Sequence, residues 1–408
     1  MLIAPDAFKG TLSAAAAAAA IAEGWRRQRP QDHLDLCPLA DGGDGFGSVL
    51  ASLLDAEEHC CATVDAAGRP RQARWWSAPC PPALSADLAL RGPAAAPPAG
   101  RIPPDSVAAG PAIAARLAIL EVAEAIGLAL LPQELRDPFA LDSRGLAPLL
   151  EAAASSGAAR VLLGLGGTAT NDAGFGLARA LGWRFCDAAG RELQAWPELE
   201  RLARVLAPPQ PHPLAGRLLV AVDVTNPLLG PLGASAVYGP QKGLLPADQP
   251  RAEACLQRLA ASLDERDPGA AARPGSGAGG GLGFALQLFC GGRLLPGAPL
   301  VASLAGLEQR LAAADLLISG EGRFDRQSAM GKGVGRLLTL ARQAGCPALL
   351  LLGQADPQAL QDALAEAPPG GLRALALLPD LAAEEEARRE PACCLARLAQ
   401  RAAADWAV

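Results

Sequence analysis

Short apolar runs, each followed by a turn of glycine and small polar residues, recur along this chain of 408 residues. Residues 161–163 read Val-Leu-Leu, the length of a buried strand, and glycines follow at once. Stretches rich in Ala, Leu and Ser lie between such runs, at residues 14–20, 48–56 and 146–154, and favour helices. This alternation predicts an α/β protein built on parallel sheets. The other predicted strands cover residues 2–4, 34–39, 116–122, 218–222, 316–319, 347–352 and 372–378.

The turn after residues 161–163 concentrates small polar side chains. Four of them fall within five positions: Thr168, Thr170, Asn171 and Asp172. A glycine turn between a strand and a helix presents backbone N–H groups to an anion, and a carboxylate there can accept a proton or hold Mg²⁺. The alternative is a tight turn in which Thr or Asn caps the helix. The density of hydroxyl, amide and carboxylate groups favours a functional site.

Charged residues follow other predicted strands as well. Asp6 and Lys9 come after residues 2–4, and Asp41 and Asp44 flank a Gly-Gly pair after residues 34–39. Ligands of open α/β sheets bind at the carboxyl ends of strands, so these residues are candidates for a site. Acidic residues at a helix start also complement the helix dipole, which is the structural alternative. Further candidates in comparable turns are Asp223, Lys242, Glu321, Arg323, Asp325 and Lys332.

Two segments depart from the alternation. Residues 60–110 are rich in Pro and predict a loop or an excursion from a strand-rich region. Residues 274–283 read PGSGAGGGLG, and no strand precedes them, which argues against a dinucleotide-binding turn. A flexible loop that covers phosphate, or a domain hinge, fits this composition better.

Composition narrows the classes of function. A net charge of −6 argues against a nucleic-acid or anionic-membrane partner. The 10 cysteines contain no Cys-x-x-Cys pair and are typical of small apolar fillers in a reducing cytoplasm. The 3 histidines lie apart from the glycine turns, which disfavours zinc sites and Ser-His-Asp catalysis. We expect no signal peptide and no transmembrane segment, and the length predicts two domains.

The polar clusters, taken in order, resemble the bacterial glycerate kinase family. They read IAPDAFKGTLSA, LADGGDG, GLGGTATNDAG, DVTNPLLGP with GPQKG, GAGGGLG, and ISGEGRFDRQS with GKG, across residues 3–333. The resemblance implies ATP- and Mg²⁺-dependent phosphorylation of (R)-glycerate to 2-phosphoglycerate by a cytoplasmic monomer or homodimer. It also implies a flavodoxin-like domain of residues 1–62 and 295–408. A second mixed α/β domain, residues 63–294, is inserted into it, and the active site lies in the cleft between the two.

Phosphoryl transfer needs charge neutralisation, in-line positioning, and a carboxylate that takes a proton or holds the metal. We predict catalytic roles for Asp172, Lys9 and Asp6. Asp172 is the first choice for base or metal partner, so the Asp172→Asn variant is expected to keep its fold and lose most turnover. The predicted metal ligands are Asp41, Asp223 and Asp325. The predicted ATP-binding residues are Gly166, Gly167, Thr168, Thr170, Asn171, Lys242, Glu321, Arg323 and Lys332.

Two segments depart from the family's pattern. Residues 142–148 read DSRGLAP where the family usually carries a Tyr-Gly-Thr-Gly type of run. In LEVAEAIGL, Val122 and Glu124 replace a Met and a small residue. Both changes bear on the acceptor pocket, so a kinase for a related small hydroxy acid is one alternative. A Mg²⁺-dependent phosphatase and a non-catalytic sensor of a small acid are the others.

Overall fold

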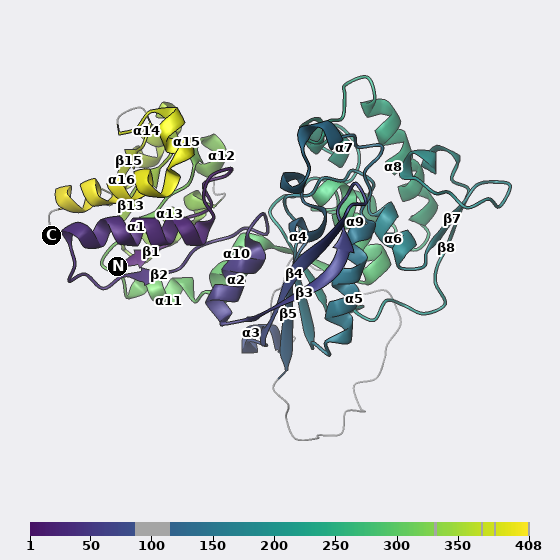
Figure 1. Cartoon of the computed structure of the whole chain (residues 1–408), viewed down its shortest axis with the longest axis horizontal. Coiled ribbons are helices and arrows are strands. Elements are labelled where there is room, and N and C mark those ends of the chain that lie inside the picture. Colours follow the sequence, from purple (N-terminus) through teal and green to yellow (C-terminus); the bar gives the residue numbers. More distant parts are fainter. Residues whose placement is uncertain (86–114, 330–332, 369, 379–380, 407–408) are drawn as a thin grey trace. The chain divides into compact units, whose positions relative to one another are not determined.

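The chain forms two compact units. A computed structural model describes residues 1–85, 115–329, 333–368, 370–378 and 381–406 (Figure 1). Unit 1 comprises Met1–Asp41, Ser48–Leu53 and Gly297–Val408, and unit 2 comprises Gly42–Gly47 and Leu54–Pro296. Each unit contains a sheet with parallel strands and covering helices, so the predicted α/β class is confirmed.

The unit boundaries differ from the predicted domain boundaries near the first junction. The boundary expected between residues 62 and 63 falls inside strand β3 (Glu57–Val64), which lies wholly in unit 2. A strand paired along its length to one neighbour moves with that sheet, so a boundary inside it is physically unfavourable. Gly42–Gly47, placed by sequence in the first domain, also pack in unit 2.

Unit 1 is built on a five-stranded sheet in the order β15-β13-β11-β1-β2, and all its strand pairs are parallel. Counted along unit 1, this is the order 2-1-3-4-5 of flavodoxin-like folds. The chain reverses direction across the sheet between neighbouring strands β1 and β11. Ligands of such sheets bind at this switch point. The strands are β1 (Leu2–Ile3), β2 (Asp35–Leu36), β11 (Leu317–Ser319), β13 (Ala348–Leu352) and β15 (Leu372–Ala376).

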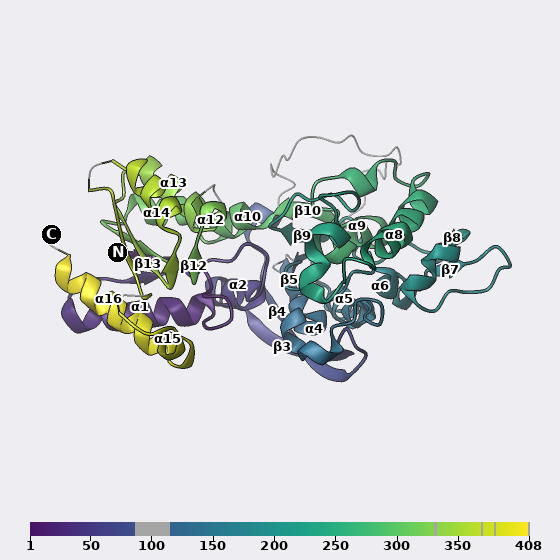
Figure 2. The ribbon, with the colours of Figure 1, turned by 90° about the horizontal axis from the view of Figure 1, so that it is seen from above.

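Helices cover both faces of this sheet, because successive strand side chains point to opposite faces and both sets are apolar. Helices α1 (Ala14–Gln28) and α16 (Pro391–Asp405) pack on the face that carries Ile3, Ile318 and Leu349. Helices α11 (Leu307–Ala312), α13 (Val334–Gln343) and α14 (Pro357–Ala365) pack on the other face. Figure 2 shows the α1–α16 pair and the α13–α14 pair on opposite sides of β13. The remaining elements of unit 1 are α10 (Gly297–Leu304), β12 (Arg323–Phe324), α12 (Arg326–Ala329), β14 (Gln354–Ala355) and α15 (Glu384–Arg389).

Unit 2 is built on a six-stranded mixed sheet in the order β10-β9-β6-β5-β4-β3. Strands β5, β6, β9 and β10 are parallel, whereas β4 runs antiparallel to both β5 and β3. The carboxyl ends of β5, β6 and β9 therefore lie at one edge of the sheet. The strands are β3, β4 (Pro70–Pro79), β5 (Arg116–Glu121), β6 (Arg160–Gly164), β9 (Leu218–Val222) and β10 (Arg293–Pro296).

One apolar core fills unit 2. It joins sheet side chains such as Leu120 and Leu163 to helical side chains such as Leu150 and Leu256. The helices are α3 (Pro82–Ser85), α4 (Ala123–Ile126), α5 (Ala147–Ser155), α6 (Phe175–Ala180), α7 (Ala234–Tyr238), α8 (Gln249–Leu263) and α9 (Ala278–Cys290). Strands β7 (Arg184–Cys186) and β8 (Arg204–Leu206) form a separate antiparallel pair. Helix α2 (Phe46–Leu54) contains the second and third crossings of the chain between the units, after Gly47 and after Leu53.

Two segments of unit 2 differ from the sequence prediction. Part of the irregular stretch expected at residues 60–110 is strand, because β3 and β4 pair in register from Glu57–Ser77 to Val64–Pro70. Residues 86–114 lie outside the described part of the chain. The glycine run expected as a flexible loop or hinge forms the start of α9, where Gly279, Gly280 and Gly281 take left-handed conformations. Gly280 and Gly281 are buried, which does not fit an open covering loop.

Within the described ranges, no helix is both long enough and apolar enough to cross a membrane.

Candidate active site

The strand ends of unit 2 bring together residues from distant parts of the sequence. Because β5, β6 and β9 are parallel neighbours, Glu121, the glycine turn that begins at Gly164 and Asp223 all follow carboxyl ends at the same sheet edge. The segment Gly42–Gly47 also packs in this unit. Two glycine-rich motifs that are far apart in the sequence, Gly42–Gly47 and the turn that begins at Gly164, therefore lie in the same unit.

Close backbone packing joins the two glycine-rich segments. The N–H of Gly166 donates to the carbonyl of Gly42 over 2.8 Å, and a Cβ on Gly166 would lie 2.3 Å from Cα of Gly43. Gly167 has φ +71°, and a Cβ there would lie 1.7 Å from Oδ1 of Asp44. These glycines are required for close approach. The contact places the Asp44 carboxylate directly against the Gly166–Gly167 turn.

Glu121 binds the same segment from the end of β5. Its side chain is 5% exposed, and its two oxygens accept hydrogen bonds from the backbone N–H groups of Gly45 (2.8 Å) and Gly47 (2.9 Å). Burial raises the pKa of Glu121 to about 7, against the lowering effect of these two hydrogen bonds. The carboxylates of Glu124 and Asp44 raise it further. Glu121 was not among the residues predicted from the sequence; its position at the end of a buried strand was the available signal.

Asp172 is fully buried and bonded inside the fold. It accepts hydrogen bonds from the N–H and hydroxyl of Ser143 (2.9 and 2.7 Å) and from the N–H groups of Gly174 and Gly176 (both 3.0 Å). Burial, the largest effect, raises its pKa, while the hydrogen bonds from Gly176 and Ser143 lower it. The carboxylate thus satisfies the open N–H groups at the start of α6 and ties them to Ser143. This geometry favours a positioning role over proton abstraction.

Lys242 is buried beside the polar turn that follows β6. Its ammonium donates to Oγ1 of Thr168 (3.0 Å) and to the carbonyl of Thr170 (2.6 Å). Burial lowers the pKa of Lys242 to about 7, and the charge of Asp172 opposes that shift. The lysine holds the turn in shape from inside the unit.

Two polar atoms of this turn stay unsatisfied. Oγ1 of Thr170 and Oδ1 of Asn171 are buried and have no hydrogen-bond partner within the described part of the chain. The amide nitrogen of Asn171 donates to Oγ of Ser235 over 3.0 Å. The glycine run packs against this turn, since a Cβ on Gly280 would lie 1.9 Å from the carbonyl oxygen of Thr170.

In unit 1, charged residues gather at the switch point between β1 and β11. The N–H of Asp6 donates to the carbonyl of Gly320 over 2.9 Å, which joins the loops after the two strands. Glu321 is half-buried, and burial raises its pKa to about 7. Asp6 and Asp325 add to this shift and Lys9 opposes it, so all three charges lie near Glu321. Oε1 of Glu321 is buried without a hydrogen-bond partner among the described residues.

A pocket of unit 1 opens beside these loops. Asp6, Asp41 and Arg336 supply its charged groups. Its walls are apolar and come mainly from α10, α11 and α13, with Ala298, Ala302, Leu307, Leu337 and Leu340. The pocket therefore combines an apolar lining with two carboxylates and one guanidinium.

The structure separates some of the predicted site residues. Asp6, Lys9, Asp41, Glu321, Arg323 and Asp325 belong to unit 1, whereas Asp223 and the turn with Lys242 belong to unit 2. Among the described residues, no three His, Cys, Asp or Glu side chains form a group that could hold a metal ion. Lys332 lies outside the described residues.

Comparison with known proteins agrees with this class of α/β protein, which carries charged glycine turns at strand ends. The model of the glycerate kinase family matches residues 1–89 and 93–407, so the chain belongs to that family.

Several relatives carry the family's name. The chain is 33% identical over 356 residues to a glycerate kinase of Halalkalibacterium halodurans, covering 86% of this chain and 85% of the relative. It is 34% identical over 341 residues to glycerate 2-kinase of Escherichia coli K12, and the match covers 81% of this chain and 79% of the relative. A crystal structure assigned to glycerate kinase 2 of Salmonella typhimurium LT2 covers 99% of this chain and 96% of its own, with a TM-score of 0.71 and 31% identity.

Proposed function

We propose that this protein is a glycerate kinase that transfers the γ-phosphoryl group of ATP to the 2-hydroxyl of (R)-glycerate. Membership of the glycerate kinase family over nearly the whole chain supports the reaction class. The assignment of the 2-hydroxyl as the acceptor is supported by the similarity to the Escherichia coli glycerate 2-kinase, which covers 81% of the chain.

The observation that carries the proposal at the level of geometry is the charged switch point of unit 1. The N–H of Asp6 donates to the carbonyl of Gly320, next to Glu321, over 2.9 Å. Asp6, Lys9 and Asp325 lie near enough to Glu321 to shift its pKa. Open α/β sheets bind their ligands at this position. Phosphoryl transfer needs both kinds of charge there, since cations neutralise the phosphates and carboxylates take a proton or a metal ion.

Mg²⁺ fits the donors of this site. Glu321 carries a buried oxygen without a partner in the described residues, and carboxylate oxygens are hard ligands suited to Mg²⁺. Proteins usually hold Mg²⁺ through one or two carboxylates together with substrate phosphates, so a cage of three protein ligands is not required. Glu321 and Asp325 would hold the ion, and the bound ion would neutralise charge on the phosphates.

The chain's other residues have distinct proposed roles. Lys9, in the loop after β1, and Arg323, in the short strand β12, are exposed and would bind anionic groups of the substrates. Asp6 would accept the proton of the glycerate hydroxyl. Lys242 would shape the turn of residues 168–171 from within unit 2, because it is buried and bonded to Thr168 and Thr170. Asp172 would fix the start of α6, which follows that turn.

The cysteine chemistry supports a reducing compartment such as the cytoplasm. All ten cysteines lie in the described residues, and all are free thiols. Burial raises the pKa of Cys37 and Cys255 to about 11, so these thiols resist ionisation and disulfide exchange.

The decisive experiment measures ADP release with ATP, Mg²⁺ and (R)-glycerate, and resolves the product by ³¹P NMR. We expect 2-phosphoglycerate. ADP release only with another hydroxy acid would indicate that the acceptor differs. Phosphate release from 2-phosphoglycerate without stabilisation of the fold by ATP would indicate a phosphatase. Binding of a small acid without turnover would indicate a sensor.

A further inference from the structure

We propose that Glu121 is a positioning residue for the kinase reaction: through the backbone amides of Gly45 and Gly47 it holds the carboxylate of Asp44 against the Gly166–Gly167 turn. This inference rests on the proposed function, because it assigns part of that function to Asp44.

The segment that carries Asp44 needs external support. Gly42, Gly43, Gly45 and Gly47 leave the backbone with little conformational preference of its own, and Gly42 and Gly45 adopt φ +110° and +87°. Within the segment, the N–H of Phe46 donates to the carbonyl of Gly43 over 3.2 Å. A glycine-rich backbone of this kind takes its orientation from its contacts with the rest of unit 2.

Those contacts hold Asp44 from both sides. On the N-terminal side, the carbonyl of Gly42 accepts from the N–H of Gly166 over 2.8 Å. On the C-terminal side, Glu121 accepts from Gly45 over 2.8 Å and from Gly47 over 2.9 Å. Gly45 directly follows Asp44, so Glu121 fixes the peptide on which the Asp44 side chain depends. Hydrogen bonds from N–H groups to a buried carboxylate are among the stronger ones in proteins.

Apolar packing fixes the same segment. Phe46 is fully buried, and a Cβ on Gly164 would lie 2.5 Å from its ring. A Cβ on Gly47 would lie 2.1 Å from the ring of Trp76 on β4. The chain after Asp44 is therefore held by Glu121 and by two aromatic rings.

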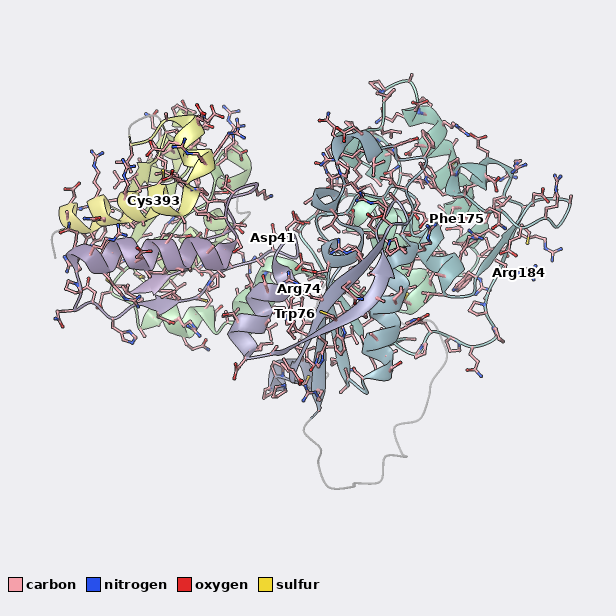
Figure 3. All side chains as sticks on the ribbon, viewed as in Figure 1. Asp41, Arg74, Trp76, Phe175, Arg184 and Cys393 are labelled. Carbon is pink, nitrogen blue, oxygen red and sulfur yellow. The ribbon has the colours of Figure 1, made fainter. Side chains whose placement is uncertain are left out.

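Charged side chains near Glu121 come from α4, from the segment that carries Asp44 and from β4. Glu124 on α4 and Asp44 in the segment carry the same charge as Glu121. Arg74 on β4 carries the opposite charge; it pairs with Glu124 and lies over the Trp76 ring at 5.5 Å (Figure 3). Glu121 has no ion pair among the described residues, so its carboxylate is stabilised mainly by the two glycine amides. This arrangement suits an anchor for backbone.

A double-mutant cycle tests whether Glu121 acts through Asp44. We measure kcat and KM for wild type, Glu121→Gln, Asp44→Asn and the double variant. Asp44→Asn and Glu121→Gln are each expected to lower kcat by about tenfold or more. In the Asp44→Asn background, Glu121→Gln is expected to change kcat by less than about twofold, because residues that act as a unit are not additive. If the fold-reduction of kcat in the double variant equals the product of the two single reductions, the proposal is overturned.

Control variants separate positioning from general loss of structure. Glu151→Gln makes the same chemical change at an exposed position of α5 and is expected to leave kcat near the wild-type value. If Glu121→Gln does not fold, Gly167→Ala serves instead, since its methyl group would displace Asp44 while Glu121 stays intact. It is expected to lower kcat and to show no further loss in the Asp44→Asn background. A wild-type kcat for Gly167→Ala would overturn the proposal.

Hydrogen exchange supplies a readout independent of turnover. Peptides that cover residues 42–48 are expected to exchange faster in Glu121→Gln than in wild type, and to exchange at the wild-type rate in Glu151→Gln. Unchanged exchange in Glu121→Gln would overturn the proposal that Glu121 holds this segment, even if the kinase reaction is present. Faster exchange in a protein that never phosphorylates glycerate would instead overturn the proposed function, and the role of Glu121 in holding the segment would stand.

Discussion

The ammonium of Lys242 donates a hydrogen bond to the hydroxyl of Thr168, 3.0 Å away, in the interior of unit 2. The two residues are 74 positions apart in sequence, and both side chains are buried. A lysine in such a place carries a charge whose hydration is lost, which is why its pKa falls to about 7. This relationship makes the stability of the unit depend on pH.

We expect the buried Lys242 to make the protein more stable as pH rises from 7 toward 10.5. Its pKa is 10.5 in the unfolded chain and about 7 in the fold, so in this window the unfolded state binds more protons. The free energy of unfolding should rise by about 2 kcal/mol between pH 7 and pH 9 from this group alone. Urea unfolding of wild type and Lys242→Met at both pH values measures the difference. An equal pH dependence in the two proteins would contradict a Lys242 whose charged form is disfavoured by burial.

The Asp172→Asn variant is expected to lose stability as well as turnover. Asp172 accepts four hydrogen bonds, and an amide in its place would direct N–H groups at N–H donors. We expect a loss of about 3 kcal/mol in the free energy of unfolding, because buried donors are left unsatisfied. Ser143→Ala, which removes the hydroxyl but keeps its N–H, should cost about 1 kcal/mol.

Turnover per folded molecule then decides the role of Asp172. Activity that falls only with the folded fraction supports a positioning role. A well-folded Asp172→Asn protein that has lost most of its kcat would support the direct catalytic role predicted from the sequence.

The Glu321→Gln variant tests the Mg²⁺ proposal. Removing the charge from a carboxylate that has a buried, unpartnered oxygen should raise the Mg²⁺ concentration needed for half-maximal activity by about tenfold or more. Activity titrated with Mg²⁺ at saturating ATP measures it. Glu385→Gln, at an exposed position of α15, is the matched control and should titrate like wild type. The same Mg²⁺ requirement in Glu321→Gln and wild type would place the ion elsewhere.

Alanine at Gly280 should destabilise the fold more than alanine at Gly269. Both glycines have positive φ, +70° and +74°, so alanine is strained at each. A Cβ at Gly280 would lie 1.9 Å from the carbonyl oxygen of Thr170, whereas nothing lies within 4 Å of one at Gly269. We expect Gly269→Ala to cost about 1 kcal/mol and Gly280→Ala about 3 kcal/mol or more. Thermal unfolding of both variants measures the difference, and equal losses would contradict the packing of the glycine run on the polar turn.

The positions of most strands in the two large sheets could be read from the sequence because their signals are local. The predicted strands at 161–163, 218–222 and 347–352 lie within β6, β9 and β13 or coincide with them, to a residue or so. Apolar runs of this length, ended by glycine or proline, leave few other conformations. The pair β3–β4 was not recognised, because its residues mix exposed, half-buried and buried positions without a regular alternation.

The positions of polar groups within the site could not be read in this way. Asp172, Lys242 and Glu121 each bond to residues far away in sequence, and the chemistry of each depends on those partners. An aspartate that faces water and one that caps a buried helix are the same residue type in the sequence, although their pKa values and roles differ.

The sequence by itself determined the α/β class, the chain order of most strands in the two large sheets, and the membership of a kinase family. The hydrophobic period, the glycines that end each strand and the order of the motifs are properties of neighbouring residues. Only the tertiary structure decided that Gly42–Gly47 pack on the turn at Gly166 and Gly167, and that Glu121 secures them. The physical reason is that desolvation and hydrogen-bond partnership arise when distant segments pack together, and both then set which carboxylates are left to act on a substrate.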